Sequence, residues 1–152
     1  MTLEQEYLNM SKKQKIMLQE TYDRGSKFNA GFTLAAIYWK ESQAGLYRIN
    51  VYDPSCGAFH NNLNSVFARH DYKNTKFKKN IICQKLIDSY DFSLAEATAE
   101  IEYWKEVHEN NWYSIWSSYN AGWNTKAGAK YANDIKAKIL VLKKYIKVNN
   151  GI

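Results

Sequence analysis

The sequence predicts a mainly α-helical single domain that carries one small β ribbon. Three observations point to this fold class. The chain has 152 residues, which is enough for one real hydrophobic core. It contains one Pro and only 7 Gly, which favours long helices over a many-turned β fold. Hydrophobic residues make up 45% of the chain, and in most segments they recur at helical spacing.

The N-terminal part, residues 1–29, is expected to form two helices. Each opens with a capping box, in which a Ser or Thr and a Gln three residues later satisfy the first free amide groups. The two pairs are Thr2 with Gln5 and Ser11 with Gln14. They predict helices at Leu3–Met10 and Lys12–Arg24. Gly25 is expected to stop the second helix in a left-handed conformation.

The central element is an apolar helix from Ala30 to Gln43, ended by Gly45. A nearly unbroken apolar run, Phe32–Trp39, indicates a helix buried on most sides. The helix delivers a carboxylate, Glu41, at its end. Because desolvation disfavours an ionised carboxyl group, a Glu placed there can hold a proton and act as a general acid. Spacing alone favours the alternative that Glu41 only marks where the helix meets water.

The stretch Leu46–Phe59 is the least helical part and is expected to form the ribbon, because apolar and polar residues alternate in it. Asp53-Pro54-Ser55 is a turn signal, and Gly57 permits a further turn. Helices are expected over most of the remaining chain. They are Asn61–Arg69, Ile81–Tyr90, Leu94–Glu109, Trp112–Tyr119 and Ala127–Ile146.

Three connecting features complete this prediction. Ser93 with Glu96 forms a further capping box for the helix that begins at Leu94. Asp71–Asn80 holds four Lys and is expected to be an exposed basic loop, with a solvated surface as the preferred interpretation. Asn120-Ala121-Gly122 is expected to break the chain between the last two helices, and residues 147–152 are expected to fray.

Charge and cysteine content limit the functional class. The net charge of +6 attracts polyanions such as nucleic acid, anionic lipid or the bacterial cell wall. Cys56 and Cys83 are expected to be free thiols, and no spacing indicates a metal site or a cofactor. His70 and His108 are expected to be structural. The N-terminus lacks a signal-peptide pattern and no apolar run approaches the roughly twenty residues of a membrane span, so synthesis in the cytoplasm without stable membrane insertion is expected.

Four short segments stand out when they are considered together in chain order. They are Glu41-Ser42, Asp53-Pro54-Ser55-Cys56-Gly57-Ala58-Phe59-His60, Ser118-Tyr119-Asn120-Ala121-Gly122 and Lys130-Tyr131-Ala132. In this order they resemble the lysozyme-like superfamily, in the branch of soluble lytic transglycosylases and related phage endolysins. That family has Glu-Ser at the end of an apolar helix, a ribbon with Ser and Gly, a Tyr-Asn-Ala-Gly motif and a Tyr in a C-terminal helix. The resemblance spans about Phe32 to Ile139.

The resemblance implies a single lysozyme-like domain over residues 1–152, with residues 30–146 as its catalytic core. Glu41 would protonate the glycosidic oxygen between N-acetylmuramic acid and N-acetylglucosamine. It would then take a proton from the muramyl 6-hydroxyl, giving a 1,6-anhydro product, or from water, giving hydrolysis. The implied partner is the peptidoglycan glycan strand, bound by a monomer without metal or cofactor. A phage endolysin released to the wall, or a lysin carried on a virion, fits this picture.

Five further residues occupy positions that the family uses around its substrate. They are Ser55, Gly57, His60, Tyr119 and Asn120. By resemblance, the Tyr119 hydroxyl would hold Glu41 in place, and Gly57 would keep the ribbon thin where the glycan passes. His60 stands where the family has Gln, so a substrate contact and a structural role are both open.

Several alternatives remain open at this point. Asp53 could position water in an inverting hydrolysis, although a turn role is its default. Aromatic residues make up 15% of the chain, and several could stack on sugar rings. These candidates are Trp39, Tyr47, Tyr52, Trp116 and Trp123. A basic, aromatic-rich domain could instead bind single-stranded nucleic acid, or bind the cell wall without cleaving it. Nucleic-acid binding does not explain the ordered set of motifs, so no nucleic-acid partner is expected. The presence of Glu41 argues against a lysozyme-like protein that binds the wall without cleaving it.

Overall fold

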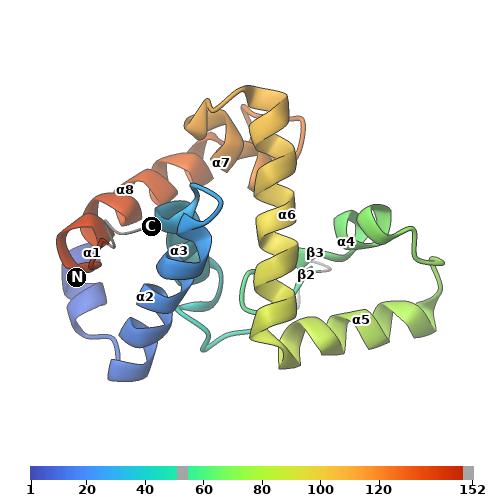
Figure 1. The fold of residues 1–152 in the computed structure, drawn as a ribbon, viewed down its shortest axis with the longest axis horizontal. Helices are drawn as coiled ribbons and strands as arrows, with labels where there is room; N and C mark the ends of the chain where they lie inside the picture. Colours follow the sequence, from blue (N-terminus) through green and yellow to red (C-terminus); the bar gives the residue numbers. More distant parts are fainter. Residues whose placement is uncertain (51–54, 149–152) are drawn as a thin grey trace.

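The computed structural model describes residues 1–50 and 55–148, and within them the chain is mainly helical (Figure 1). The helices are α1 (Leu3–Leu8), α2 (Lys12–Ser26), α3 (Gly31–Ser42), α4 (Leu63–His70), α5 (Lys76–Asp88), α6 (Tyr90–His108), α7 (Trp112–Ala121) and α8 (Ala129–Tyr145). Three two-residue strands, β1 (Ile49–Asn50), β2 (Ser55–Cys56) and β3 (Asn61–Asn62), pair antiparallel in the order β1-β2-β3. The predicted fold class, mainly α with a small ribbon, is confirmed at this level.

The N-terminal helices begin as predicted. Both capping boxes are present, at Thr2 and at Ser11. The prediction that Gly25 stops α2 is wrong, because the helix continues to Ser26. Gly25 has a packing role instead: a Cβ there would lie 2.9 Å from the Cδ1 of Leu34, so the glycine lets α2 lie close against α3.

Helix α3 is the centre of the main hydrophobic cluster, as its apolar run predicts. Leu34, Ile37 and Trp39 are fully buried, and each such side chain contributes roughly 1.5–3 kcal/mol of burial free energy. The Trp39 indole donates its N–H to Glu6 on α1 at 2.8 Å, which also fixes the N-terminal helix. Helices α2 and α8 cover α3, so its C-terminal end is held rigidly in the body of the molecule (Figure 1).

The residue after Glu41 explains how α3 ends. The Ser42 hydroxyl donates to the carbonyl of Tyr38 at 3.0 Å and accepts from the amide of Gly45 at 2.9 Å. The chain then turns through Gln43 and Ala44 in left-handed conformations. The Glu-Ser pair therefore combines a carboxylate at the helix end with the side chain that closes the following turn.

A second, smaller hydrophobic cluster lies beyond α6. It consists of Cys56, Leu63, Val66, Phe67, Ile82 and Leu86, and it joins β2 to α4 and α5. We refer to residues 61–88, which contain β3, α4 and α5, as the arm. Figure 1 shows α6 running between the arm and the body formed by α1, α2, α3, α7 and α8. The molecule thus has two packed clusters, with α6 between them.

The basic segment Asp71–Asn80 is not entirely a loop. Helix α5 begins inside it, at Lys76, because the Thr75 side chain accepts a hydrogen bond from the amide of Lys78 and caps the helix. The predicted start at Ile81 is therefore wrong by more than one helical turn.

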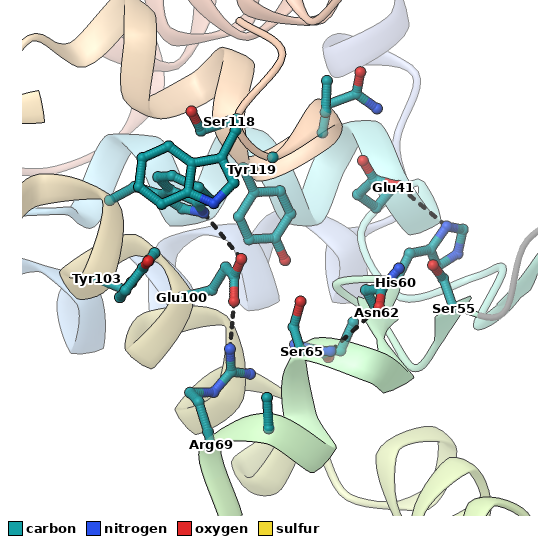
Figure 2. Close-up of a pocket in the computed structure, with 17 residues that line it drawn as sticks. Glu41, Ser55, His60, Asn62, Ser65, Arg69, Glu100, Tyr103, Ser118 and Tyr119 are labelled. Atoms are coloured by element: carbon teal, nitrogen blue, oxygen red, sulfur yellow. Dashed lines mark hydrogen bonds and ion pairs between the residues drawn. The ribbon is translucent and has the colours of Figure 1, made fainter. Parts of the chain in front are cut away.

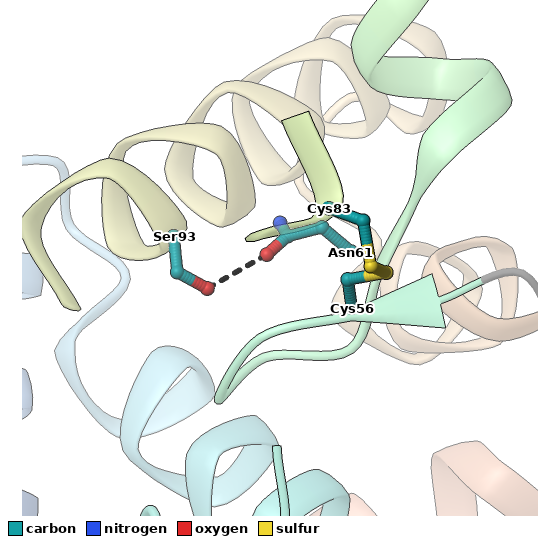
Figure 3. Close-up of a disulfide and its surroundings, with 4 residues drawn as sticks. All are labelled: Cys56, Asn61, Cys83 and Ser93. Atoms are coloured by element: carbon teal, nitrogen blue, oxygen red, sulfur yellow. Dashed lines mark hydrogen bonds between the residues drawn. A yellow bond between two sulfur atoms is a disulfide. The ribbon is translucent and has the colours of Figure 1, made fainter. Parts of the chain in front are cut away.

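The predicted capping box at Ser93 is also wrong. Helix α6 begins at Tyr90, because Ser89 is its N-cap and accepts from the amide of Phe92 at 3.0 Å. The Ser93 hydroxyl instead donates to the Asn61 side chain at 2.8 Å (Figure 3). A Ser and a Glu three residues apart can match the capping pattern inside a helix when both side chains have tertiary partners.

The expectation of free thiols is contradicted. Cys56 on β2 and Cys83 on α5 form a disulfide, with their Cα atoms 5.4 Å apart (Figure 3). The bridge forms because β2 packs against α5, a contact between segments 27 residues apart that spacing alone does not reveal. Among the described residues, no helix has both the length and the apolarity needed to cross a membrane.

Candidate active site

A cleft of about 740 Å³ lies between the body and the arm, and Glu41 stands on its wall (Figure 2). The end of α3, the ribbon and the end of α7 form one side of it. Helices α4 and α6 form the other side. The lining residues used below are Glu41, Ser55, His60, Arg69, Glu100, Tyr103, Trp104, Tyr119, Asn120 and Trp123.

Glu41 and His60 form the closest polar pair on the α3 side of the cleft. The Oε2 atom of Glu41 lies 3.1 Å from the Nδ1 atom of His60, as Figure 2 shows. Their side chains are 19% and 11% exposed, so both are largely shielded but still reach the cleft. His60 adopts a left-handed backbone conformation with φ +43°, which is uncommon for a residue with a side chain. Such a conformation is retained where the surrounding structure imposes it.

The hydrogen bonds of His60 restrict where its proton can be. Its Nε2 atom lies 2.9 Å from the carbonyl oxygen of Tyr47, which can only accept, so Nε2 carries a hydrogen. The Nδ1 atom faces Oε2 of Glu41 at the edge of the cleft, so the two side chains form a polar contact along which a proton can pass.

The partly buried Tyr119 and the buried Tyr131 lie close to Glu41. Burial raises the pKa of Tyr119 well above its usual value, and the negative charge of Glu41 raises it further. Burial likewise raises the pKa of Tyr131, again with a contribution from Glu41. Both hydroxyls therefore remain protonated at neutral pH and are available as donors. The two rings lie 6.4 Å apart and nearly parallel.

The two hydroxyls are used differently. The Tyr119 hydroxyl donates to the carbonyl of Phe59 at 2.9 Å, so it holds the backbone that carries His60. This corrects the expectation that Tyr119 holds Glu41 directly. Among the described residues, the buried Tyr131 hydroxyl has no hydrogen-bond partner. It lies near the carboxylate with an unused donor.

The other candidate positions divide into two groups. Ser55 and Asn120 line the same cleft as Glu41, with Ser55 buried on β2 and Asn120 exposed on α7. Gly57 does not line it: a Cβ there would lie 2.6 Å from the carbonyl of Leu86 and 2.8 Å from the Ser93 hydroxyl. The lack of a side chain at Gly57 lets the ribbon pack closely on α5 and α6. This corrects the expectation that Gly57 keeps the ribbon thin for a passing glycan. Asp53 lies outside the described residues.

Of the proposed stacking residues, Trp123 lines the cleft and is 70% exposed. Trp39 is core, and Trp116 donates its indole N–H to Thr33. Tyr47 is exposed outside the cleft lining, and its carbonyl supports His60. Tyr52 lies outside the described residues.

The wall formed by α4 and α6 was not predicted from the sequence. Arg69 pairs with Glu96 at 2.8 Å. It also pairs with Glu100, which in turn accepts from the Trp104 indole at 2.9 Å (Figure 2). Glu96 is buried and also binds His70, so this histidine has a carboxylate partner after all. These pairs connect the arm to α6 across the floor of the cleft.

A usable signal for this wall was present in the sequence. Glu96, Glu100 and Trp104 recur at four-residue spacing on α6, so they share one helical face, and two acids lie on it beside a large aromatic residue. Trp104 and Trp123 meet edge to face at 4.9 Å, with the exposed Tyr103 beside them. Together these rings form an aromatic wall opposite Glu41. His108 binds the Ser118 hydroxyl at 2.7 Å, in agreement with a structural role.

Within the described residues, no cluster of three or more His, Cys, Asp or Glu side chains is arranged to hold a metal ion. The chemical groups that line the cleft include a carboxyl–imidazole pair, the Tyr119 side chain, a guanidinium–carboxylate pair and an aromatic wall.

Comparisons with known proteins place the chain beside one phage protein. No protein-family model matches the chain, and no solved structure matches it. A protein of Enterobacteria phage T4, described as the uncharacterized 20.7 kDa protein in the vs-regB intergenic region, is 31% identical to it over 130 residues. The match covers 82% of this chain and 68% of the T4 protein.

Proposed function

The chain belongs to the same family as the uncharacterized T4 protein, and we propose that it cleaves bacterial peptidoglycan at the bond from N-acetylmuramic acid to N-acetylglucosamine. The proposal includes a lysozyme-like fold and the activity of a lytic transglycosylase. It is supported by the ordered motifs from Glu41-Ser42 to Lys130-Tyr131-Ala132 and by the phage origin of the relative. A phage endolysin or a lysin carried on the virion, acting at the host wall, is the biological role we infer.

The observation that carries the proposal is the position of Glu41. It stands at the end of a buried helix, on the wall of an open cleft, and 3.1 Å from an imidazole nitrogen. A general acid must be held rigidly, shielded from bulk water and still reach its substrate. Glu41 meets all three requirements.

The first chemical step uses the proton held at Glu41. Protonated Glu41 donates it to the glycosidic oxygen, the bond from the muramyl C1 to that oxygen breaks, and N-acetylglucosamine leaves with a free 4-hydroxyl. The carbonyl oxygen of the substrate's own N-acetyl group bonds to C1, so the protein supplies no nucleophile. Glu41 is now ionised, and its charge is balanced by the cationic ring formed on the sugar.

The second step regenerates the acid. Ionised Glu41 accepts the proton of the muramyl 6-hydroxyl as its oxygen bonds to C1 and the bond from C1 to the N-acetyl oxygen breaks. The products are a 1,6-anhydromuramyl end and protonated Glu41. If water takes the place of the 6-hydroxyl, the same cycle gives hydrolysis, which is the alternative outcome.

Tyr131 can act selectively on the ionised state of Glu41. Its buried hydroxyl has no partner among the described residues, and it lies near the carboxylate. A hydrogen bond to Glu41 that strengthens as the negative charge develops stabilises the transition state more than the resting state. His60 and Tyr119 serve a different purpose, because they fix the position of the carboxyl group and of the adjacent turn.

The far wall is suited to hold the sugars. Tyr103, Trp104 and Trp123 present ring edges and faces to the cleft, and aromatic rings pack well against the apolar faces of pyranoses. Among the described lining residues Glu100 is the second carboxylate, but Arg69 and the Trp104 indole already occupy it. We therefore assign Glu100 to shaping the wall and not to proton transfer.

The test is digestion of purified peptidoglycan by the wild type and by Glu41→Gln, with fragment masses measured by mass spectrometry. Fragments lighter than hydrolysis products by one water molecule, absent with the variant, are expected. Glu100→Gln is the matched control, because it also neutralises a cleft carboxylate, and it should still release anhydro fragments. Full-mass reducing fragments would identify a muramidase. If the wild type releases nothing, the enzymatic proposal fails, and binding to wall or nucleic acid is tested next.

A further inference from the structure

The arm as a whole, residues 61–88, carries a net charge of +4, because Asp71 and Asp88 flank a strongly basic segment. Residues 72–87 contain five Lys and no Asp or Glu, so this segment carries +5 of the formal +6. The five are Lys73, Lys76, Lys78, Lys79 and Lys85. The rest of the chain is close to neutral, with a net +1. This concentration creates a local positive field that the average composition does not show.

Ion pairs neutralise some lysines outside the arm but not all of them. Lys40, Lys105, Lys138 and Lys144 each form an ion pair with a carboxylate, whereas Lys12, Lys13 and Lys136 form none among the described residues. Within residues 1–50 and 55–148, none of the five arm lysines forms one. Lys78 and Lys85 lie over the rings of Tyr72 and Phe92 at 4.6 and 4.1 Å, which orients them without neutralising them. The charge on the arm is therefore uncompensated.

Two apolar side chains lie in the middle of this charge. Phe77 is 75% exposed and Ile81 is 45% exposed, and they are four residues apart, so they lie on one face of α5. The opposite face of α5 is anchored, because Ile82 and Leu86 are buried and Cys83 is in the disulfide. Figure 1 shows α5 at the outer edge of the molecule, away from α1, α2 and α8. The Phe77–Ile81 face is thus held outward by a fixed helix.

We propose that the outer face of α5 docks on an anionic phospholipid bilayer. Exposed lysines around a protruding aromatic and an aliphatic side chain are the features of a helix that binds at a membrane interface. The lysines would contact anionic head groups while Phe77 and Ile81 enter the boundary of the acyl chains. A soluble polyanion would satisfy the lysines but would leave Ile81 exposed, since a branched aliphatic side chain offers no stacking surface. The two side chains therefore favour a lipid surface over a nucleic acid or a wall polymer.

This docking goes beyond the proposed cleavage activity and does not depend on it. The Phe77–Ile81 face lies outside the cleft lining, so the arm can contact a bilayer while the cleft stays open to another ligand. Binding at the surface is sufficient, because no helix in the described part of the chain is able to span a membrane.

The test is co-sedimentation of the full chain with vesicles of phosphatidylglycerol mixed with phosphatidylcholine, and with vesicles of phosphatidylcholine alone. Binding to the anionic vesicles only is expected. Each lysine at such a surface strengthens binding about fivefold, so Lys76→Gln/Lys78→Gln/Lys79→Gln should weaken it about 100-fold. Phe77→Ser should weaken it about tenfold without changing the charge.

Matched variants distinguish docking from general charge attraction. Lys12→Gln/Lys13→Gln/Lys136→Gln removes the same charge from exposed body positions, and Leu140→Ser removes an apolar side chain that is 58% exposed on α8. Both should bind vesicles within about twofold of the wild type. The proposal is overturned if anionic vesicles do not bind, if the body triple variant loses as much binding as the arm triple variant, or if Phe77→Ser binds like the wild type. The last outcome, with retained binding to a soluble polyphosphate, would assign the arm to polyanions instead.

Discussion

Removing the Cys56–Cys83 disulfide should destabilise the protein, and most of the loss should appear in the arm. The bridge closes a loop of 27 residues that contains β3 and α4. In the chain-entropy description, such a crosslink restricts the unfolded chain and stabilises the folded state by about 3.5 kcal/mol at 25 °C. This is a large fraction of the roughly 5–15 kcal/mol that holds a typical domain together.

The loss should be local because the two hydrophobic clusters are separate. The arm cluster is small and relies on Leu63, Val66, Phe67, Ile82 and Leu86, whereas the body cluster around α3 does not include the cysteines. Urea titration of the oxidised and reduced protein gives the change in unfolding free energy. Hydrogen exchange followed by mass spectrometry shows where protection is lost, and residues 63–88 should lose it first.

The control is Cys56→Ala/Cys83→Ala, which should match the reduced wild type in both measurements. Thiol titration before and after reduction should find none and then two reactive thiols. Two reactive thiols in the native, unreduced protein would contradict the bridge itself. A confirmed bridge whose reduction changes the unfolding free energy by less than about 0.5 kcal/mol would refute the loop-entropy reasoning.

Further predictions concern the groups around Glu41 and the ion pair on α8. Tyr119→Phe leaves the Phe59 carbonyl without its donor, so the unfolding free energy measured by urea titration should fall by about 1–3 kcal/mol. Tyr131→Phe removes a hydroxyl that has no partner among the described residues, so it should not lower this free energy. Equal losses in the two variants would contradict these different roles of the two hydroxyls. Burial is the main cause that raises the pKa of Tyr90 to about 12, and it also raises the pKa values of Tyr119 and Tyr131. The contribution of these tyrosines to stability is therefore complete below about pH 10 and is lost as pH rises through their folded pKa values. Unfolding titrations from neutral to alkaline pH should show this decline, and it should be shallower in Tyr131→Phe. Burial raises the pKa of Asp134, but hydrogen bonds from Lys138 and Lys40 bring that pKa below its usual value. Asp134 therefore stabilises the folded protein above about pH 4, and this stabilisation is lost as pH falls through its folded pKa. Asp134→Asn should make the unfolding free energy fall less steeply in acid, and an unchanged acid dependence would exclude the ion pair as its cause. His60→Ala should slow peptidoglycan cleavage about 10²-fold by releasing Glu41, and His60→Gln, which keeps a donor, should slow it less; equal rates for both variants would remove His60 from the site.

Features set by local chemistry were predictable from the sequence. The capping boxes at Thr2 and Ser11 and the burial of α3 depend on residues a few positions apart, and the structure confirms them. The position of Glu41 at the end of that helix follows from the same pattern. Its placement on a cleft wall together with Ser55, Tyr119 and Asn120 followed from motif order, which spacing could suggest but not prove.

Features set by tertiary partners were not predictable in this way. Ser93 and Glu96 match a local pattern, but each forms its hydrogen bonds with the arm. Gly25 looks like a helix stop, yet its small size is required by the close approach of α3. Cys56 and Cys83 could be paired only once β2 was known to pack on α5. In each case the deciding partner is distant in the sequence, so no local pattern carries the information.

The two separate hydrophobic clusters have a consequence for how this family can diverge. The carboxyl group of Glu41 is fixed by the body cluster, while Asn62, Ser65 and Arg69 on the facing wall are fixed by the arm cluster. Replacement of apolar residues in the arm therefore alters the width and lining of the cleft without repacking α3. Selection can act on the two walls at different rates, so relatives can exchange one binding preference for another while the same acid is retained.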